Sequence, residues 1–109
     1  MKVFLAVKDD NGIISMIDSR FARAKFFMIY DMEKEEILKI EDNKFVSQEH
    51  GVGIKIAGYA VEEGCKLAIG AKPGPKADEI LKAGGIEFFF AENCTAGEAI
   101  ENFKKSKES

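Results

Sequence analysis

The chain opens with an uninterrupted apolar run from Val3 to Val7. A strand with one face in water alternates apolar and polar residues, whereas a strand covered on both faces is apolar throughout. Lys2–Val7 is therefore predicted to be a central strand of a sheet that carries helices on both faces. This arrangement places the chain in the α/β class.

The next two segments with strand character, Phe26–Met32 and Glu36–Asp42, are separated by three polar residues. So short a connection favours an antiparallel hairpin. In the second segment Leu38 and Ile40 alternate with charged residues, so one face of this strand is predicted to be wet. The hairpin is therefore predicted to form one edge of the sheet.

The second half of the chain alternates between amphipathic and apolar segments, which is typical of helices and buried strands in turn. The predicted elements are a helix between Gly53 and Gly64, a strand at Lys66–Ile69, a helix at Pro75–Ala83, a strand at Ile86–Phe90 and a helix capped by Thr95. The charged tail Lys104–Ser109 is expected to fray.

This order of elements predicts a mixed five-stranded sheet of strand order 3-2-1-4-5, flanked by helices, with the second strand antiparallel to the first. Residues 1–109 are expected to form a single domain, because neither half of the chain could bury a core of its own. In open α/β sheets ligands bind beyond the carboxyl ends of the strands, where the strand order reverses. The ligand crevice is therefore predicted beyond the carboxyl ends of the first and fourth strands.

The charge and composition of the chain argue against several classes of protein. A formal net charge of -3 does not suit a surface devoted to nucleic acid. No apolar run approaches the roughly 20 residues that cross a bilayer, and the first residues do not resemble a secretory signal. With two cysteines and no CxxC pair, the chain is expected to be a cytoplasmic protein with reduced thiols.

The two cysteines, Cys65 and Cys94, are predicted to lie at opposite ends of the sheet, because one precedes a parallel strand and the other follows the neighbouring strand. A disulfide needs its two Cα atoms within about 7 Å, so none is expected. Cys65 is interpreted as a small buried residue. Cys94 lies on the ligand side, where a thiolate contact remains an open alternative.

A turn between a predicted strand and a predicted helix, residues 70–76, is the strongest local feature. Gly70 and Gly74 allow a close backbone approach, Pro75 suits a first helical position, and Lys72 and Lys76 add positive charge. Because a helix start exposes unpaired N–H groups, the turn is interpreted as an anion cradle. The alternative is an ordinary turn with solvated lysines. The spacing is not that of a Walker A loop.

The loop Ser19–Ala24 carries two arginines, Arg20 and Arg23. A guanidinium group can fork onto carboxylate or phosphate oxygens, and this loop precedes a strand that is antiparallel to the first. It is therefore expected to reach the crevice, with Arg23 as a ligand contact. The alternative is that one arginine pairs with Asp18 or Asp31.

His50 is the only histidine of the chain, and Gly51 and Gly53 follow it at a predicted helix start. A lone histidine on a polar loop is commonly just exposed to solvent, and one histidine cannot close a metal site. An imidazole on such a mobile segment can nevertheless reach a ligand. His50 is therefore interpreted as one contact to a metal cluster whose other positions are already filled.

Catalytic alternatives lack the necessary residues. No nucleophile elbow accompanies His50, so a hydrolase triad is not predicted. A two-metal carboxylate site would have to use Asp9, Asp10, Asp31 and Asp78, but Asp31 is predicted to lie at the far end of the sheet from Asp9. The chain is therefore expected not to be an enzyme.

Five short motifs recur in an order and at a spacing that resemble a known family. They are Ser19-Arg20-Phe21-Ala22-Arg23-Ala24-x-x-Phe27, Asn43, His50-Gly51-Val52-Gly53, Gly70-x-x-x-Gly74-Pro75-Lys76-Ala77 and Leu81-x-x-x-Gly85-Ile86. With the opening strand and the turn that follows it, they look like the dinitrogenase iron-molybdenum cofactor biosynthesis family, the small NifX-like domains. Ala22 departs from the glycine common there, and Cys94 is not a standard ligand of that family.

The resemblance implies a ribonuclease H-like motif without nuclease activity. Family members that act in nitrogen fixation bind and carry an iron–sulfur–molybdenum cofactor or its precursors. Such a cofactor is anionic, which suits basic side chains and helix N-termini. The residues expected to contact it are Arg23, His50, Gly51, Gly53, Gly70, Lys72, Gly74 and Lys76, with His50 as the metal contact.

The leading hypothesis is therefore a non-catalytic binding or carrier domain for an anionic ligand, such as an iron–sulfur or iron–molybdenum cluster or its precursor. One alternative is a protein–protein interaction module, or a homodimer, that uses the hairpin edge at Glu36–Asp42. A ribonuclease H-like, metal-dependent nuclease is the weakest alternative. Neither a nucleic acid nor a membrane is an expected partner.

Overall fold

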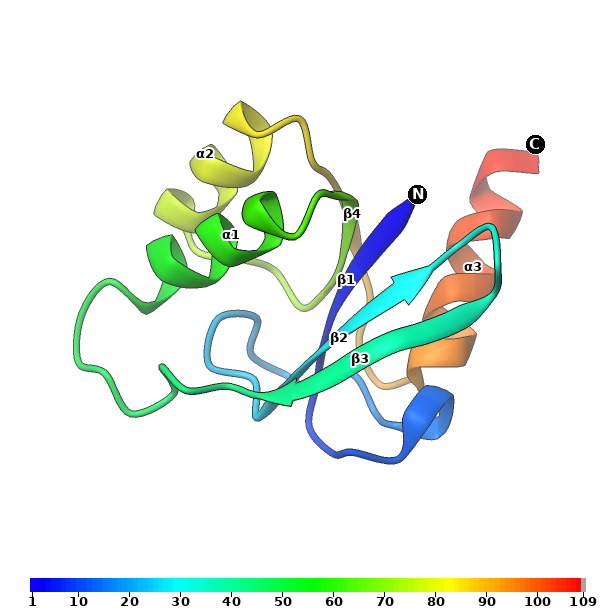
Figure 1. The fold of residues 1–109 in the computed structure, drawn as a ribbon, viewed down its shortest axis with the longest axis horizontal. Coiled ribbons are helices and arrows are strands. Elements are labelled where there is room, and N and C mark those ends of the chain that lie inside the picture. The colour runs from blue at the N-terminus through cyan, green and yellow to red at the C-terminus, as the bar shows by residue number, and fades with distance from the viewer. Residues whose placement is uncertain (109) are drawn as a thin grey trace.

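The computed structural model describes residues 1–108 and contains one mixed sheet with three helices (Figure 1). In chain order the elements are β1 (Lys2–Val7), a single 3-10 turn η1 (Gly12–Ile14), β2 (Phe26–Asp31), β3 (Glu36–Asp42), α1 (Val52–Glu62), β4 (Cys65–Gly70), α2 (Pro75–Ala83), β5 (Glu87–Phe90) and α3 (Ala96–Glu108). The predicted mixed α/β sheet with flanking helices is confirmed.

The strand order of the sheet is β3-β2-β1-β4-β5. β1 pairs antiparallel with β2, where Val7 lies opposite Phe26, and parallel with β4, where Leu5 lies opposite Ile69. Every residue of the run 3–7 is fully buried. The central position of β1, predicted from its unbroken apolar pattern, is confirmed.

Two layers of helices cover the sheet. α1 and α2 lie together on one face, and α3 lies with η1 on the other (Figure 1). The side chains of β1 alternate between the two cores: Phe4 and Ala6 face α1 and α2, whereas Val3 and Leu5 face α3. One short strand therefore supplies the middle of both cores.

The edge strand β3 differs from the simple alternation predicted for it. A bulge shifts the register, so that Ile29 lies opposite Lys39 but Tyr30 lies opposite Ile37. As a result Ile37 packs against the α3-side core with Ile40, and Leu38 is 42% exposed. The predicted inward position of Leu38 is wrong, because one extra residue in a strand turns the side chain at that point to the other face.

The charged tail is helical to Glu108, so the predicted fraying is wrong for residues 104–108, and Ser109 lies outside the described residues. The Nζ atom of Lys104 lies 2.7 Å from an oxygen of Glu35 in the hairpin turn, and that of Lys107 lies 2.8 Å from Glu87 in β5. Contacts to two separated parts of the sheet hold this last stretch of α3. Within residues 1–108 no helix has the length and apolar character needed to cross a bilayer.

The predicted cap of α3 is confirmed as a reciprocal pair. The N–H of Glu98 donates to Thr95 Oγ1 at 3.1 Å, and the N–H of Thr95 donates to Glu98 Oε1 at 2.9 Å. This capping box satisfies two donors that a helix start would otherwise leave unpaired.

We expect Thr95→Ala to lower the free energy of unfolding by about 1 kcal/mol, because the acceptor for the Glu98 N–H is lost. Urea denaturation followed by circular dichroism measures the change. Thr95→Ser keeps the hydroxyl and is the matched control. Equal destabilisation by both variants would show that the methyl group of Thr95, and not the cap, stabilises α3.

Candidate anion-binding site

One edge of the sheet gathers most of the loops that the sequence singled out. β1 ends at Val7, β4 ends at Gly70, and Phe26 at the start of β2 lies opposite Val7 and Asp42. The segments 8–25, 43–51 and 71–74 therefore all leave or join the sheet at this edge. This is the edge at which the strand order predicts a ligand crevice.

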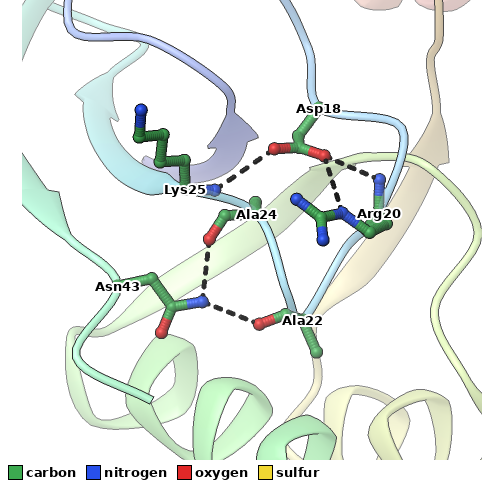
Figure 2. Close-up of polar contacts among 6 residues, drawn as sticks. All are labelled: Asp18, Arg20, Ala22, Ala24, Lys25 and Asn43. Atoms are coloured by element: carbon green, nitrogen blue, oxygen red, sulfur yellow. Dashed lines mark hydrogen bonds and ion pairs between the residues drawn. The ribbon is translucent and has the colours of Figure 1, made fainter. Parts of the chain in front are cut away.

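The buried carboxylate of Asp18 shapes the loop that carries the arginines (Figure 2). Its Oδ1 accepts the N–H of Arg20 at 3.0 Å and lies 3.5 Å from Nε of the same residue, and its Oδ2 accepts the N–H of Lys25 at 3.2 Å. Asp18 thus joins the two ends of the 18–25 loop. The alternative that an arginine pairs with Asp18 holds for Arg20.

Asn43 fixes the same loop from the other side (Figure 2). Its Nδ2 donates to the carbonyl oxygens of Ala22 and Ala24, each at 2.8 Å, and its Oδ1 accepts the N–H of Phe45 at 2.9 Å. Asn43 is 5% exposed; its bond to Ala24 is buried, and those to Ala22 and Phe45 are partly buried. One amide therefore joins the arginine loop to the segment that leads toward His50.

Arg23 pairs with neither of the acidic residues suggested as partners for an arginine, Asp18 and Asp31, within residues 1–108. Its guanidinium donates to the main-chain carbonyl of Val46 at 2.8 Å and to that of Glu49 at 3.3 Å. Among residues 1–108 it has no carboxylate partner, so its positive charge is not neutralised. Arg23 thus bridges the arginine loop and the segment that carries His50.

The N-termini of α1 and α2 open into one hollow of about 390 Å³. Gly51 and Gly74 are the N-caps, and neither helix start is capped by a side chain. The first N–H groups of a helix have no intrahelical partner, and the helix dipole is positive there. The hollow is lined by Gly51, Gly53, Ile54, Gly74, Pro75, Lys76 and Ala77. The structure thus brings four of the predicted contact residues together.

Two glycines of the predicted site have packing reasons to be glycine. A Cβ atom on Gly53 would lie 3.3 Å from Cβ of Ala77, where α1 crosses α2. A Cβ atom on Gly70 would lie 3.2 Å from the ring of Phe21 and 3.5 Å from Cβ of Ala6. Gly70 therefore lies against the core beneath the arginine loop and does not line the hollow.

Lys72 lies apart from the hollow, beside a second one of about 670 Å³ between the start of α2 and β5, which Phe88 and Phe90 also line. Both Lys72 and Lys76 are exposed, and neither forms an ion pair within the described chain. Their charges flank the N-terminus of α2 and remain available to an anion.

His50 is exposed on the segment just before the N-cap of α1. Among the described residues no group of three His, Cys, Asp or Glu side chains could hold a metal ion. Any metal that His50 contacts would therefore need most of its ligands from elsewhere. Gly51 has a φ of 75°, a conformation that residues with a side chain rarely adopt.

The cysteines are free and lie at opposite ends of the sheet, as predicted. Cys65 lies opposite Lys2 at the amino end of β1, and Cys94 follows β5. Burial raises the pKa of Cys65 to about 11 and also raises the pKa of Cys94. Neither thiol is therefore prepared as a thiolate by its surroundings.

Asp18 and Asn43 hold the arginine loop in place, a role that the sequence did not predict for either residue. Asp18 entered only as a partner for an arginine, and Asn43 only as part of a resemblance. A buried polar side chain has no distinguishing pattern in a sequence, because burial depends on what packs over it. The one signal was their position between regular elements, where Asx turns are common.

Comparisons with known proteins show the family and the fold of the chain. The model of a family described as dinitrogenase iron-molybdenum cofactor matches residues 1–106. An uncharacterized protein of Methanocaldococcus jannaschii is 32% identical over 98% of this chain and 88% of its own length.

Two solved structures share the fold. The apo form of the orange protein from Desulfovibrio gigas has a TM-score of 0.90 at 26% identity, covering 97% of this chain and 88% of that one. A Thermotoga protein of the DUF35 family, described provisionally as NifB, has a TM-score of 0.82 at 32% identity, covering 97% and 89%.

We expect iodoacetamide at pH 8 to alkylate Cys94 before Cys65. Cys65 is 2% exposed and burial raises its pKa to about 11. Iodoacetamide therefore has little access to this thiol, and only a small fraction of it is in the reactive thiolate form. Mass spectrometry of digested protein measures the order. In guanidinium both thiols should react at similar rates, and faster labelling of Cys65 in the folded protein would contradict the packing at the start of β4.

We expect Asn43→Ala to lower the free energy of unfolding by about 2–3 kcal/mol, because it leaves two carbonyls and one N–H without their partner. Chemical denaturation measures the loss. Asn102→Ala, at an exposed position of α3, is the matched control and should change stability by no more than about 0.5 kcal/mol. Equal effects of the two substitutions would contradict the role given to Asn43.

Proposed function

Because this chain belongs to the dinitrogenase iron-molybdenum cofactor family, we propose that it is a non-catalytic carrier for an anionic metal–sulfur cluster or its precursor. The cargo is of the iron–sulfur or iron–molybdenum type. The observation that carries the proposal is the hollow into which α1 and α2 open, with two uncapped helix starts and the unpaired Lys76.

The electrostatics of this edge favour an anion although the chain as a whole is acidic. Two helix N-termini contribute partial positive charge, and Lys72 and Lys76 add two full charges. α1 has no acidic residue in its first turn, and Asp78 of α2 is paired with Lys82 at 2.9 Å. The first turns of the two helices therefore place little unpaired negative charge against an anion, and the exposed Glu49, two residues before Gly51, is the nearest acidic residue before α1.

Each proposed contact has a distinct part. The backbones of Gly51, Gly53 and Gly74 present N–H groups or allow close approach, and Lys72 and Lys76 supply charge. His50 offers an imidazole nitrogen to a metal at the rim. Gly70 acts indirectly, by allowing Phe21 to pack beneath the arginine loop. The part played by Arg23 depends on its bonds to the His50 segment.

A carrier has to release its cargo, and this edge suits reversible binding. The surroundings of both cysteines keep the thiols protonated, and the proposed donors are one imidazole, two ammonium groups and main-chain amides. Such contacts bind an anion without the slow exchange of a multidentate thiolate site. Neither a nucleophile nor a general base is required.

The edge strand β3 gives the alternative of an interaction module less support. Lys39 on this strand lies 3.1 Å from Glu41 and 2.8 Å from Glu63, and a bulge interrupts the ladder. Charges and bulges are devices that protect a strand edge from pairing with another chain.

We further propose that the chain forms one domain with the ribonuclease H-like motif and acts in the cytoplasm.

The proposal is tested by anaerobic incubation with two probes: tetrathiomolybdate, a coloured molybdenum–sulfur anion, and Fe²⁺ with sulfide. We expect visible absorbance to elute with the protein from a sizing column. Lys72→Ala with Lys76→Ala should weaken tetrathiomolybdate binding about tenfold, because two charges are lost. His50→Ala should reduce retention of iron.

Lys105→Ala is the matched control, since Lys105 is exposed on α3, on the opposite face of the sheet from α1 and α2, and its loss should leave binding unchanged. Failure of both probes to elute with the parent protein at micromolar concentration would overturn the proposal. Equal weakening by the control and by the double variant would place the site elsewhere.

A further inference from the structure

The segment 43–51 is attached to the body of the protein unevenly. Its first part is anchored, because the N–H of Asn43 donates to the carbonyl of Lys25 at 3.0 Å. For residues 46–50, the hydrogen bonds that reach outside the segment, within the described chain, are the two from Arg23 to Val46 and Glu49. Arg23 thus makes the hydrogen bonds that join the half of the segment bearing His50 to the rest of the described chain.

Arg23 is well placed to act as a fixed support. The residues on either side of it, Ala22 and Ala24, both have their carbonyl oxygens bonded to Nδ2 of Asn43 at 2.8 Å (Figure 2). The main chain at Arg23 is therefore held in place. From this base a planar guanidinium, whose donors form a rigid fork, spans two carbonyls.

The bond to Glu49 also determines the backbone direction at the site. A peptide group is planar and trans, so a carbonyl of Glu49 aimed at Arg23 fixes the orientation of the His50 N–H. The next residue, Gly51, is the N-cap of α1 and has a φ of 75°. The bond from Arg23 therefore fixes the direction of the main chain immediately before the N-terminus of α1, which lines the hollow.

We propose that Arg23 is a positioning residue, which holds His50 and the start of α1 in the anion-binding arrangement through Val46 and Glu49 and does not contact the ligand. The inference rests on the proposed function of this edge. A direct ligand contact would require the guanidinium to give up the two carbonyl bonds that now hold it.

The first test uses the ligand-free protein and the variants Arg23→Met and Arg23→Lys. Hydrogen exchange should accelerate by about tenfold or more in Arg23→Met at the amides of Gln48 and Lys55, whose hydrogen bonds to the carbonyls of Phe45 and Gly51, each at 3.1 Å, lie at the two ends of the stretch that Arg23 holds. His50 is the only histidine of the chain, so its imidazole proton signals are unambiguous in NMR spectra. These signals should shift in Arg23→Met. Unchanged exchange and unchanged His50 signals would overturn the proposal.

The second test separates positioning from charge. Lysine keeps the positive charge but lacks the planar fork. We expect Arg23→Lys and Arg23→Met to weaken tetrathiomolybdate binding by similar factors, about tenfold. Binding by Arg23→Lys close to that of the parent, with strong loss in Arg23→Met, would show that Arg23 acts by its charge on the ligand and would overturn the proposal.

Arg20→Met is the matched control, because Arg20 lies on the same loop and bonds to Asp18 without reaching the segment 43–51. It should alter neither exchange at the amides of Gln48 and Lys55 nor the His50 signals. Protection of the β1 amides reports whether each variant is folded. If the parent binds neither tetrathiomolybdate nor iron with sulfide, the proposed function fails, while the exchange and NMR measurements still decide whether Arg23 positions His50.

Discussion

The burial of β1 on both faces is the constraint on which the rest of the structure depends. A strand that is fully buried has to be paired on both sides and covered above and below, because its peptide groups and apolar side chains have no access to water. β2 and β4 supply the pairing, and the helices supply the two covers. Since β4 is parallel to β1, the loops that follow both strands leave the sheet at the same edge.

That edge is organised by buried polar side chains more than by the basic residues on its surface. Asp18 closes the arginine loop, and Asn43 joins this loop to the segment before α1. Arg23 then extends the same network to the residues next to His50. The close packing of Gly53 on Ala77 then holds the two helix starts beside one another.

The predictions that succeeded and those that failed differ in what they depended on. The central strand, the hairpin and the cap at Thr95 follow from patterns of neighbouring residues, and the structure has them. The position of Leu38 was wrong because a bulge cannot be read from alternation, and the tail was wrong because its helix is stabilised by Glu35 and Glu87, which are distant in sequence. Part of the candidate site, around the start of α2, was visible in the sequence, but the bonds of Arg23 were not.

The sequence by itself determined the class of fold, the element order and the residue types that can hold an anion, because these depend on periodicity, turn chemistry and charge. Only the tertiary structure decided which of those residues share a hollow and which serve the framework. Gly51, Gly53, Gly74 and Lys76 meet because α1 packs on α2, whereas Gly70 and Arg23 are engaged by Phe21 and by two carbonyls. The physical reason is that side-chain partners are chosen by proximity in space, which the order of residues along the chain does not specify.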